Sequence, residues 1–243
     1  GQHGPVIAGV STVNSTGCMK IPSGPTYYRG NRGRGIFASG HEPNSVKNID
    51  FINIASTGNA TACGEVLGNG MALAGGASNN VRGVYTGGFE GSPTSNRINT
   101  IQALNIPTAG AIFDFGDLTY TSQQMSGVGN QTRGVYANGY AYPLAPSTDS
   151  LDMTYDMIEF MSNGGHTEFG DIIANAACRD LATVETHIRG YFAGGVTIPG
   201  PTRQNIIDFV TISTTGNAVD SGDLDITSVN SGAGISDSHG GVE

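Results

Sequence analysis

The sequence contains no tryptophan, only two lysines and only three cysteines among its 243 residues. The cysteines, Cys18, Cys63 and Cys178, are odd in number and form no Cys-x-x-Cys pair, which excludes a disulfide framework and a zinc ribbon. We expect them to be small, partly buried apolar residues without a redox role. No apolar run approaches the roughly 20 residues that a membrane-spanning helix needs, so no membrane insertion is expected.

Basic residues are scarce as well, since nine arginines and two lysines stand against 20 acidic residues, and the formal net charge is −9. Proteins that bind nucleic acid use clustered arginine and lysine to displace counterions from the phosphates. No stretch of this chain is basic enough to form such a patch or stripe. The sequence therefore predicts no nucleic-acid partner.

Patterns typical of catalysis and of metal binding are missing too. The five histidines show no His-x3-His spacing, and no loop carries the Asp-x-Asp-x-Asp-Gly pattern of a calcium site. Neither a Gly-x-Ser-x-Gly elbow nor a P-loop occurs between a strand and a helix. We therefore expect no metal, no cofactor and no catalytic centre, and hence a protein that is not an enzyme.

Glycine, by contrast, is abundant, with 38 copies at repeated positions, as is typical of tight turns between short strands. One phrase occurs four times: Arg-Gly, two apolar residues and a cluster of small residues that includes glycine. Its copies begin at similar intervals along the chain, at Arg34, Arg82, Arg133 and Arg189. Self-similarity with a period of about 40–50 residues indicates a propeller or a repeat array.

Three further phrases accompany each Arg-Gly phrase. An apolar, β-branched run that ends in Gly, Asn and Thr follows it, most clearly at Asn48–Ala60 and Asn205–Ala218, as expected for a strand that enters a hairpin. A glycine, an acidic residue and an apolar residue come next, starting at Gly64, Gly116, Gly170 and Gly222. A short Gly/Ala-rich segment such as 71–76 precedes the next arginine. Each unit therefore predicts four strands.

The two ends of the chain fit halves of one further unit. The distance in sequence from Gly17 to Arg34 is nearly the same as that from Gly64 to Arg82. The same separation beyond Gly222 leads to Gly240, where Gly-Gly-Val replaces Arg-Gly-Val. We predict an all-β, single-domain β-propeller of about five four-stranded blades: 22–66, 67–118, 119–172, 173–224, and a last blade made by 225–243 and closed by 1–21. A shared last blade removes exposed sheet edges. An open array, two packed sheets and a helix over 172–188 are the alternatives.

The order of these phrases resembles the kelch class of propellers, through the double glycines of Val84–Gly88 and Tyr191–Gly195, although the tryptophan of eukaryotic kelch units is absent. The phrases Ile49–Ala60, Ile207–Ala218 and Phe115–Leu118 are more similar to Gly/Asn/Thr-rich kelch-like repeat proteins of marine bacteriophages, including those of cyanobacteria. The resemblance spans about residues 30–243. It implies a structural or adhesin-like protein located in the virion, with other virion proteins as partners, among them further copies in a symmetric multimer, and it carries over no catalytic residue.

The repeated arginines, Arg34, Arg82, Arg133 and Arg189, allow two interpretations. They are expected to brace one blade against the next by binding a carboxylate or a strand-end carbonyl. The alternative is a ring of guanidinium groups that binds an anionic ligand. For the recurring carboxylates we expect turn and cap roles; these residues are Glu65, Asp117, Asp171, Asp223, Asp50, Asp156 and Asp208.

One interruption of the repeat carries our main binding prediction. The segment from the arginine to the following aspartate is longer in the third unit, between Arg133 and Asp156, than in the first or the fourth unit. Loops on a rigid scaffold commonly carry recognition, and tyrosine provides contact area at low entropic cost. The candidate residues in the extra segment 139–149 are Tyr140, Tyr142, Pro143 and Asp149. Arg29 and Arg32 are the second candidates, for docking an acidic neighbour.

The sequence thus favours a non-enzymatic structural protein of a bacteriophage virion, as a tail fibre, knob or decoration module. Its loops would bind a neighbouring virion protein or a host surface glycan. The first alternative is a free lectin-like or protein-interaction propeller of bacterial origin. A glycosidase-like propeller is the second, and it requires two carboxylates that face one cleft.

Overall fold

The computed structural model describes residues 12–13, 19–20, 33–41, 45–54, 56–91, 96–137, 139–142, 150–151, 154–162, 164–173, 179–197, 202–226 and 231–236. These residues form strands, bridges and turns, so the all-β prediction is confirmed. The described part of the chain contains no helix long and apolar enough to cross a membrane.

The strands form four larger antiparallel sheets, which we number I to IV in chain order. Sheet I consists of β3 (Arg34–Ala38), β4 (Asn48–Asn53) and β5 (Thr61–Glu65). Sheet II has β6 (Gly75–Ser78), β7 (Arg82–Thr86), β9 (Asn96–Asn105) and β10 (Phe113–Gln123), with β8 (Phe89–Glu90) beside β9. Sheet III has β11 (Ser126–Gly129), β12 (Arg133–Ala137), β15 (Thr154–Glu159) and β16 (Thr167–Asp171). Sheet IV has β17 (Ala182–Glu185), β18 (Arg189–Ala193), β19 (Ile206–Thr211) and β20 (Val219–Asp223).

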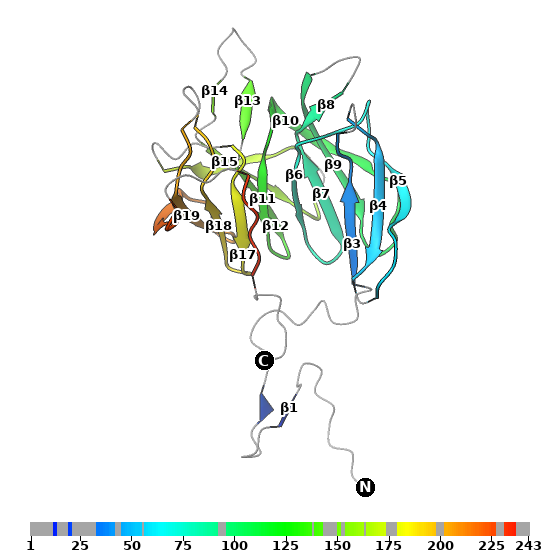
Figure 1. Ribbon diagram of the computed structural model, residues 1–243, viewed down its shortest axis with the longest axis horizontal. Helices are drawn as coiled ribbons and strands as arrows, with labels where there is room; N and C mark the ends of the chain where they lie inside the picture. The colour runs from blue at the N-terminus through cyan, green and yellow to red at the C-terminus, as the bar shows by residue number, and fades with distance from the viewer. Residues whose placement is uncertain are drawn as a thin grey trace.

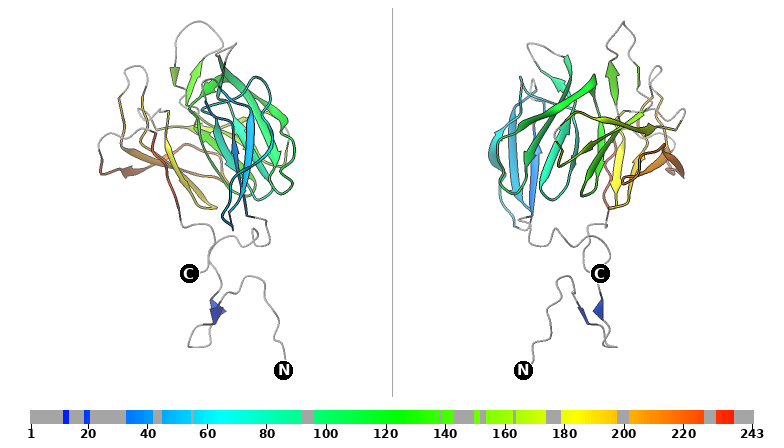
Figure 2. Two further views of the ribbon diagram at one scale, coloured as in Figure 1. Left: turned by 45° about the vertical axis from the view of Figure 1, so that its right-hand side comes forward. Right: turned by 180° about the vertical axis from the view of Figure 1, so that it is seen from behind.

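Two short pairs complete the described strands. The strands β13 (Tyr140–Tyr142) and β14 (Ser150–Leu151) extend sheet II, because β13 pairs with the end of β10. The strands β1 (Thr12–Val13) and β2 (Met19–Lys20) pair with each other. The four larger sheets stand side by side in a propeller-like arrangement, with β6, β11 and β17 innermost (Figures 1 and 2).

The order of strands within sheets II, III and IV follows the order of the phrases in the sequence. The Gly/Ala-rich segment is the inner strand, the Arg-Gly phrase starts the second strand, and the apolar run forms the third. The glycine of the Gly-acidic-apolar phrase lies at a register shift between the third and fourth strands, for example where Asp117 pairs with Thr100 next to Gly116. The segment considered as a helix contains β17 instead.

Gly116 shows why glycine is required at this bulge. Its φ is +143°, and a Cβ atom built on it would lie 2.7 Å from the backbone nitrogen of Gly165, in the hairpin of the next sheet. An L side chain would therefore meet both backbone strain and a clash. The bulge thus allows neighbouring sheets to approach closely at their outer strands.

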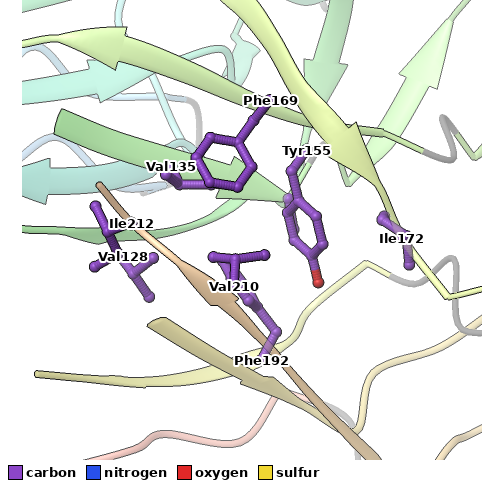
Figure 3. Packing of buried hydrophobic residues seen from close by; sticks show 9 residues of the cluster. Val128, Val135, Tyr155, Phe169, Ile172, Phe192, Val210 and Ile212 are labelled. Atoms are coloured by element: carbon purple, nitrogen blue, oxygen red, sulfur yellow. The ribbon is translucent and has the colours of Figure 1, made fainter. Parts of the chain in front are cut away.

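The hydrophobic core lies between the sheets rather than in one central layer. Between sheets III and IV, residues from both sheets pack face to face, and the buried members include Val128, Tyr155, Phe169, Phe192 and Ile212 (Figure 3). Similar clusters lie between sheets II and III and between sheets I and II. Each fully buried Phe or Ile contributes roughly 1.5–3 kcal/mol, so every sheet depends on its neighbour for stability.

A chain of hydrogen bonds connects the residues that precede the inner strands. Gln124 N donates to Leu73 O (2.7 Å), Asp180 N donates to Gln124 O (3.3 Å), and Ser231 N donates to Asp180 O (3.0 Å). All four residues have positive φ, between 53° and 59°. Residues 231–236 then run parallel to β17, and Ser236 Oγ donates to Glu185 O at the far end (2.9 Å). Segment 231–236 therefore occupies the place of an inner strand next to sheet IV.

Candidate functional site

The sheets present two different ends. We call the end where the Arg-Gly strands begin the brace end, and the opposite end, where β13 and β14 lie, the β13 end (Figure 1). At the brace end, three repeated arginines reach the next sheet. Arg34 Nη1 donates to Pro107 O (2.7 Å), and Arg82 Nη1 donates to Phe160 O (2.5 Å). Each acceptor is a backbone carbonyl in the hairpin between the third and fourth strands of the next sheet.

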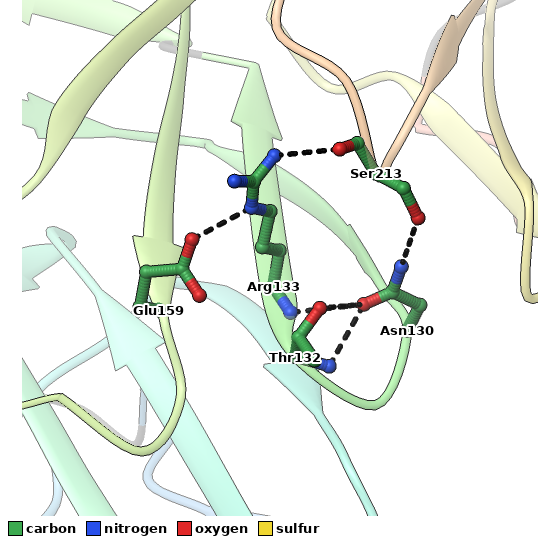
Figure 4. Close-up of polar contacts among 5 residues, drawn as sticks. All are labelled: Asn130, Thr132, Arg133, Glu159 and Ser213. Atoms are coloured by element: carbon green, nitrogen blue, oxygen red, sulfur yellow. Dashed lines mark hydrogen bonds and ion pairs between the residues drawn. The ribbon is translucent and has the colours of Figure 1, made fainter.

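Arg133 makes the same contact and shows its full geometry (Figure 4). Its Nη1 donates to Ser213 O in sheet IV (2.9 Å), while its Nε donates to Glu159 within sheet III (2.6 Å). Asn130, in the preceding turn, accepts from the backbone nitrogen of Arg133 and donates to Ser213 Oγ. The guanidinium group is therefore held on both sides, and sheets III and IV are joined by two polar contacts.

The aromatic side chains of the sheets occupy the faces of the other guanidinium groups. Arg34 lies 4.9 Å from the ring centre of Phe51, and Arg189 lies 4.5 Å from that of Phe209. Arg189 is exposed, and its Nη1 donates to Tyr191 Oη (3.4 Å). Arg34, Arg82 and Arg133, which bind carbonyls of the next sheet, fit the bracing role, whereas Arg189 is stacked on Phe209.

The predicted interruption of the repeat lies at the β13 end. Tyr140 is the first residue of β13 and pairs with Gln123 of β10. The backbone of Tyr142 ends the same strand. The other candidates, Pro143, Asp149, Arg29 and Arg32, lie outside the described residues.

Two arginines from distant parts of the chain converge on Tyr140. The guanidinium carbon of Arg97, at the start of β9, lies 3.9 Å from the centre of the Tyr140 ring, and that of Arg179 lies 5.8 Å from it. Arg179 Nη1 also bonds to Asp180 Oδ2 (3.0 Å), which accepts from Gln124 Nε2 as well (2.9 Å). Residues from sheets II and III and from the start of sheet IV thus meet in one cluster, which we call the Tyr140 cluster.

The Tyr140 cluster retains unused hydrogen-bonding capacity. Arg179 Nε and Gln123 Oε1 are buried and find no hydrogen-bond partner among the described residues. One of these atoms is a donor and the other an acceptor. A buried polar atom without a partner is costly, and such atoms in native structures call for an explanation. Neither Arg97 nor Arg179 was identified from the sequence, because neither lies in a repeated phrase.

The backbone at this cluster is strained. Gln124 and Asp180 have φ of +59° and +58°, a region in which glycine adds no steric cost. Fourteen described glycines of this chain adopt positive φ, yet these two positions carry polar side chains. The side chains of Gln124 and Asp180 are therefore present in spite of a conformational cost of order 1 kcal/mol each.

The buried aspartates correct one expectation. Asp156 and Asp208 lie inside third strands, at 3% and 4% exposure, and do not serve as turns or caps. Tyr120 donates to Asp156, whose Oδ2 also lies 3.5 Å from His166 Nε2. The bond from Tyr120 joins sheets II and III, whereas His166 directly precedes β16, in the same sheet as Asp156.

Asp208 has a different environment. Tyr155 donates to Asp208 Oδ2 (2.9 Å) across the interface between sheets III and IV. Burial raises the pKa of Asp208 to about 6, the hydrogen bonds from Tyr155 and from the backbone oppose this rise, and the charge of Asp220 adds to it. Burial and the nearby charge of Asp50 likewise raise the pKa of the Cys63 thiol, which fits a residue without a reactive role.

A cavity of about 480 Å³ lies between the inner strands. Its lining includes Ser78 of β6, Gly127 of β11, Glu185 of β17, Ser236 and Ile36. Sheet I begins, among the described residues, with its Arg-Gly strand β3, so the cavity lies where the other sheets have an inner strand. The geometry therefore fits a space for a strand rather than a binding pocket.

The carboxylates of the described residues do not gather around the cavities. Within this part of the chain, no three His, Cys, Asp or Glu side chains come together as a metal site requires. Glu185 is the carboxylate that lines the central cavity, and Glu159 is the one that lines a second cavity of about 310 Å³ beside His166. Each of the two cavities thus has one carboxylate rather than a facing pair.

Comparisons with known proteins identify the arrangement of the sheets but no family. No family model and no curated protein matches the sequence. Solved structures do match: 153 chains, among them the structure of YjhT, with a TM-score of 0.63 and 8% sequence identity. That match covers 79% of this chain and 66% of YjhT, so the chain spans just under two thirds of that protein. At this identity the likeness shows the fold alone.

Proposed function

We propose that this chain is a non-enzymatic structural protein of a bacteriophage particle, mounted as a tail fibre, knob or decoration module. Its β13 end presents a binding surface to a neighbouring virion protein or to a host surface glycan. One observation carries the binding role: the interruption of the repeat coincides with the Tyr140 cluster, at the end of the sheets opposite the braces. The particle assignment is supported by the resemblance of the repeated phrases.

The division of the arginines supports a binding role for the β13 end. Besides the four arginines of the repeated phrase, the described residues include Arg97, Arg179 and Arg203, and all three lie at the β13 end. Arg179 and Arg203 both form bridges with Val196, so their side chains emerge from the same face. The three arginines therefore gather at the end that also carries the Tyr140 cluster.

The single carboxylate in each cavity supports a role without catalysis. Hydrolysis of a glycosidic bond uses two carboxyl groups about 5–10 Å apart on either side of the bond. Neither Glu185 nor Glu159 has a second carboxylate in the lining of its cavity. Binding, rather than turnover, is therefore the activity that we assign to this scaffold.

The particle assignment is tested on virions of the phage that encodes the chain. We expect mass spectrometry of purified particles to detect the protein at a fixed stoichiometry, and gold-labelled antibodies to mark one position on each particle. Labelling of intact particles should be blocked by antibodies raised against the β13 end. A protein found in the lysate and absent from washed particles would instead favour the free bacterial-type lectin or interaction module.

We further propose that the propeller has five blades, the last of which is closed by both ends of the chain. Leu73, Gln124 and Asp180 each precede the arginine of the following Arg-Gly phrase by the same number of residues. Ser231 precedes Gly240, the degenerate copy of that arginine, by the same number. The backbone nitrogen of Ser231 donates to Asp180 O and so continues the chain of hydrogen bonds that links the residues before successive inner strands. These facts support 231–236 as the inner strand of a fifth blade.

Arg189 provides the test of closure. In a closed ring, a hairpin of the fifth blade supplies Arg189 with a carbonyl, as Phe160 supplies one to Arg82. We expect Arg189→Gln and Arg82→Gln to reduce the free energy of unfolding by similar amounts, about 1–2 kcal/mol each, in urea titrations. A loss for Arg189→Gln well below half of that for Arg82→Gln would argue against closure.

A further inference from the structure

The Tyr140 cluster contains both donors for an anion and acceptors for hydroxyl groups. Arg97 and Arg179 place their guanidinium groups next to the ring of Tyr140. A guanidinium group that is stacked on a ring keeps its N–H donors in its own plane, where they can bind oxygen atoms beside the ring. Asp180 and Gln123 supply acceptor oxygens in the same cluster. From these side chains we propose that the β13 end binds an acidic saccharide, that is, a sugar ring that carries a carboxylate or sulfate as well as free hydroxyls.

The charge balance selects a single anionic group over a polyanion. The protein as a whole is acidic, and Asp180 lies within the cluster, so a ligand with many negative charges is repelled beyond the first contact. Among the described residues that meet at Tyr140, two arginines stand against one aspartate. A ligand with one anion per ring matches this balance.

The acceptors favour a saccharide over an acidic peptide. Gln123 Oε1 is buried without a partner among the described residues, and Asp180 accepts at Oδ2 from both Arg179 and Gln124. Acceptors of this kind require donors on the ligand, and sugar hydroxyls provide several in a fixed geometry. The carboxylate of an acidic peptide side chain offers acceptors only, so Gln123 would depend on a backbone N–H of the peptide, whereas a sugar ring presents several hydroxyl donors.

The side chains of the cluster are also held in place before a ligand arrives. The carboxylate of Asp180 is fixed by its bonds to Arg179 and Gln124. The backbone nitrogen of Asp180 also donates to Gln124 O. Polar groups that are already held in place reduce the entropic cost of ordering side chains when a ligand binds.

The inference rests on the proposed role of the β13 end and is tested on the purified full chain by isothermal titration calorimetry. The probes are a galactotriose in which one residue is galacturonate, a galactotriose that carries one sulfate group, neutral galactotriose and the peptide triglutamate. We expect one or both acidic sugars to bind and the neutral sugar to bind at least tenfold more weakly, with an affinity that falls as salt is raised. Which of the two acidic sugars binds more tightly identifies the preferred anion.

Variants locate the site. Arg179→Gln and Arg97→Gln should each weaken binding of the acidic sugar by about tenfold or more, because each removes a charged donor. Arg189→Gln, which removes the same charge at the brace end, should change it by less than about twofold. Circular dichroism and urea titration confirm that each variant is folded. If Arg179→Gln fails to fold, Tyr140→Leu replaces it, with the same expected loss.

Several results would overturn the inference. These are no binding of either acidic sugar, equal binding of the neutral sugar, tighter binding of triglutamate, or equal affinity in Arg179→Gln and the native chain. Each outcome leaves the particle assignment intact, because that is decided by mass spectrometry and labelling of virions. Conversely, sugar binding by a protein absent from virions would uphold the ligand class and refute the virion role.

Discussion

The interface between sheets II and III and the interface between sheets III and IV use the same contacts at the same places. In each, an arginine of one sheet, Arg82 or Arg133, donates to a carbonyl of the next sheet. In each, a bulge glycine, Gly116 or Gly170, lies so close to the next hairpin that a Cβ atom would clash with its backbone. Repetition of the sequence has therefore reproduced the interface itself, not only the strands.

The two interfaces differ at the buried aspartate. Asp156 accepts from Tyr120 of the fourth strand of sheet II and lies beside His166. Asp208 accepts from Tyr155, of the third strand of sheet III, and its further charged neighbour is Asp220. The comparison shows that a repeated carboxylate can be satisfied by unrelated residues, and that its environment differs from one interface to the next.

The largest effect is expected from breaking the core of the III–IV interface. Phe192 is fully buried, and its ring centre lies 4.6 Å from that of Tyr155. Phe192→Ala should lower the free energy of unfolding by about 3–5 kcal/mol, as measured by urea titration, because it leaves a cavity and frees the tyrosine that binds Asp208. The control is Val219→Ala in the outer strand β20, where the side chain is 52% exposed and the loss should stay below about 1 kcal/mol. Equal losses in both variants would contradict a shared core between the sheets.

The next effect concerns pH. Unfolded Asp208 has a pKa of 3.8, whereas in the native protein it is about 6. Below about pH 3 both states are protonated. As the pH rises towards 6 the unfolded chain loses its proton first, so the native state loses stability, by up to about 3 kcal/mol.

Asp208→Asn removes this titration. The stability of the variant relative to the native chain should therefore increase between pH 4 and pH 7, as followed by urea titration at each pH. A difference that stays constant over this range, or that decreases, would show that Asp208 does not carry the pH dependence.

The smallest effect separates the two tyrosines. Tyr155→Phe leaves the buried carboxylate of Asp208 without that donor and should cost about 1–3 kcal/mol at pH 7. Tyr120→Phe should cost less, because His166 remains next to Asp156. Thermal unfolding of both variants, with Tyr191→Phe as the partly exposed control, measures the difference. The reverse order would mean that His166 contributes nothing to Asp156.

The strands of the fold were predictable because their signals are local. Each Arg-Gly phrase starts a second strand at its arginine, as in β7 and β18, and the apolar run that begins at Asn48 is β4. Alternation and turn residues determine such elements over a few residues. The segment around Tyr140 was found as a departure from the same local pattern.

The partners of Tyr140 and of the aspartates were not predictable in this way. Arg97 and Arg179 lie far from Tyr140 in the sequence, one on either side, and meet it only through the packing of the sheets. The buried aspartates were misinterpreted because both faces of a third strand are covered by neighbouring sheets, so that the consecutive residues Tyr155 and Asp156 are both buried. The expected turn and cap roles considered the residue type alone and not the partners that a neighbouring sheet supplies.

The strand β10 connects the β13 end to the opposite end of sheet II, which has a mechanical consequence. Its 11 residues, at about 3.3 Å each, extend for roughly 36 Å. Its first part pairs with β9 and carries Gly116, and its last residues pair with β13. A force applied at Tyr140 therefore passes from β13 to β10, a single strand whose other end pairs with β9 near the brace end.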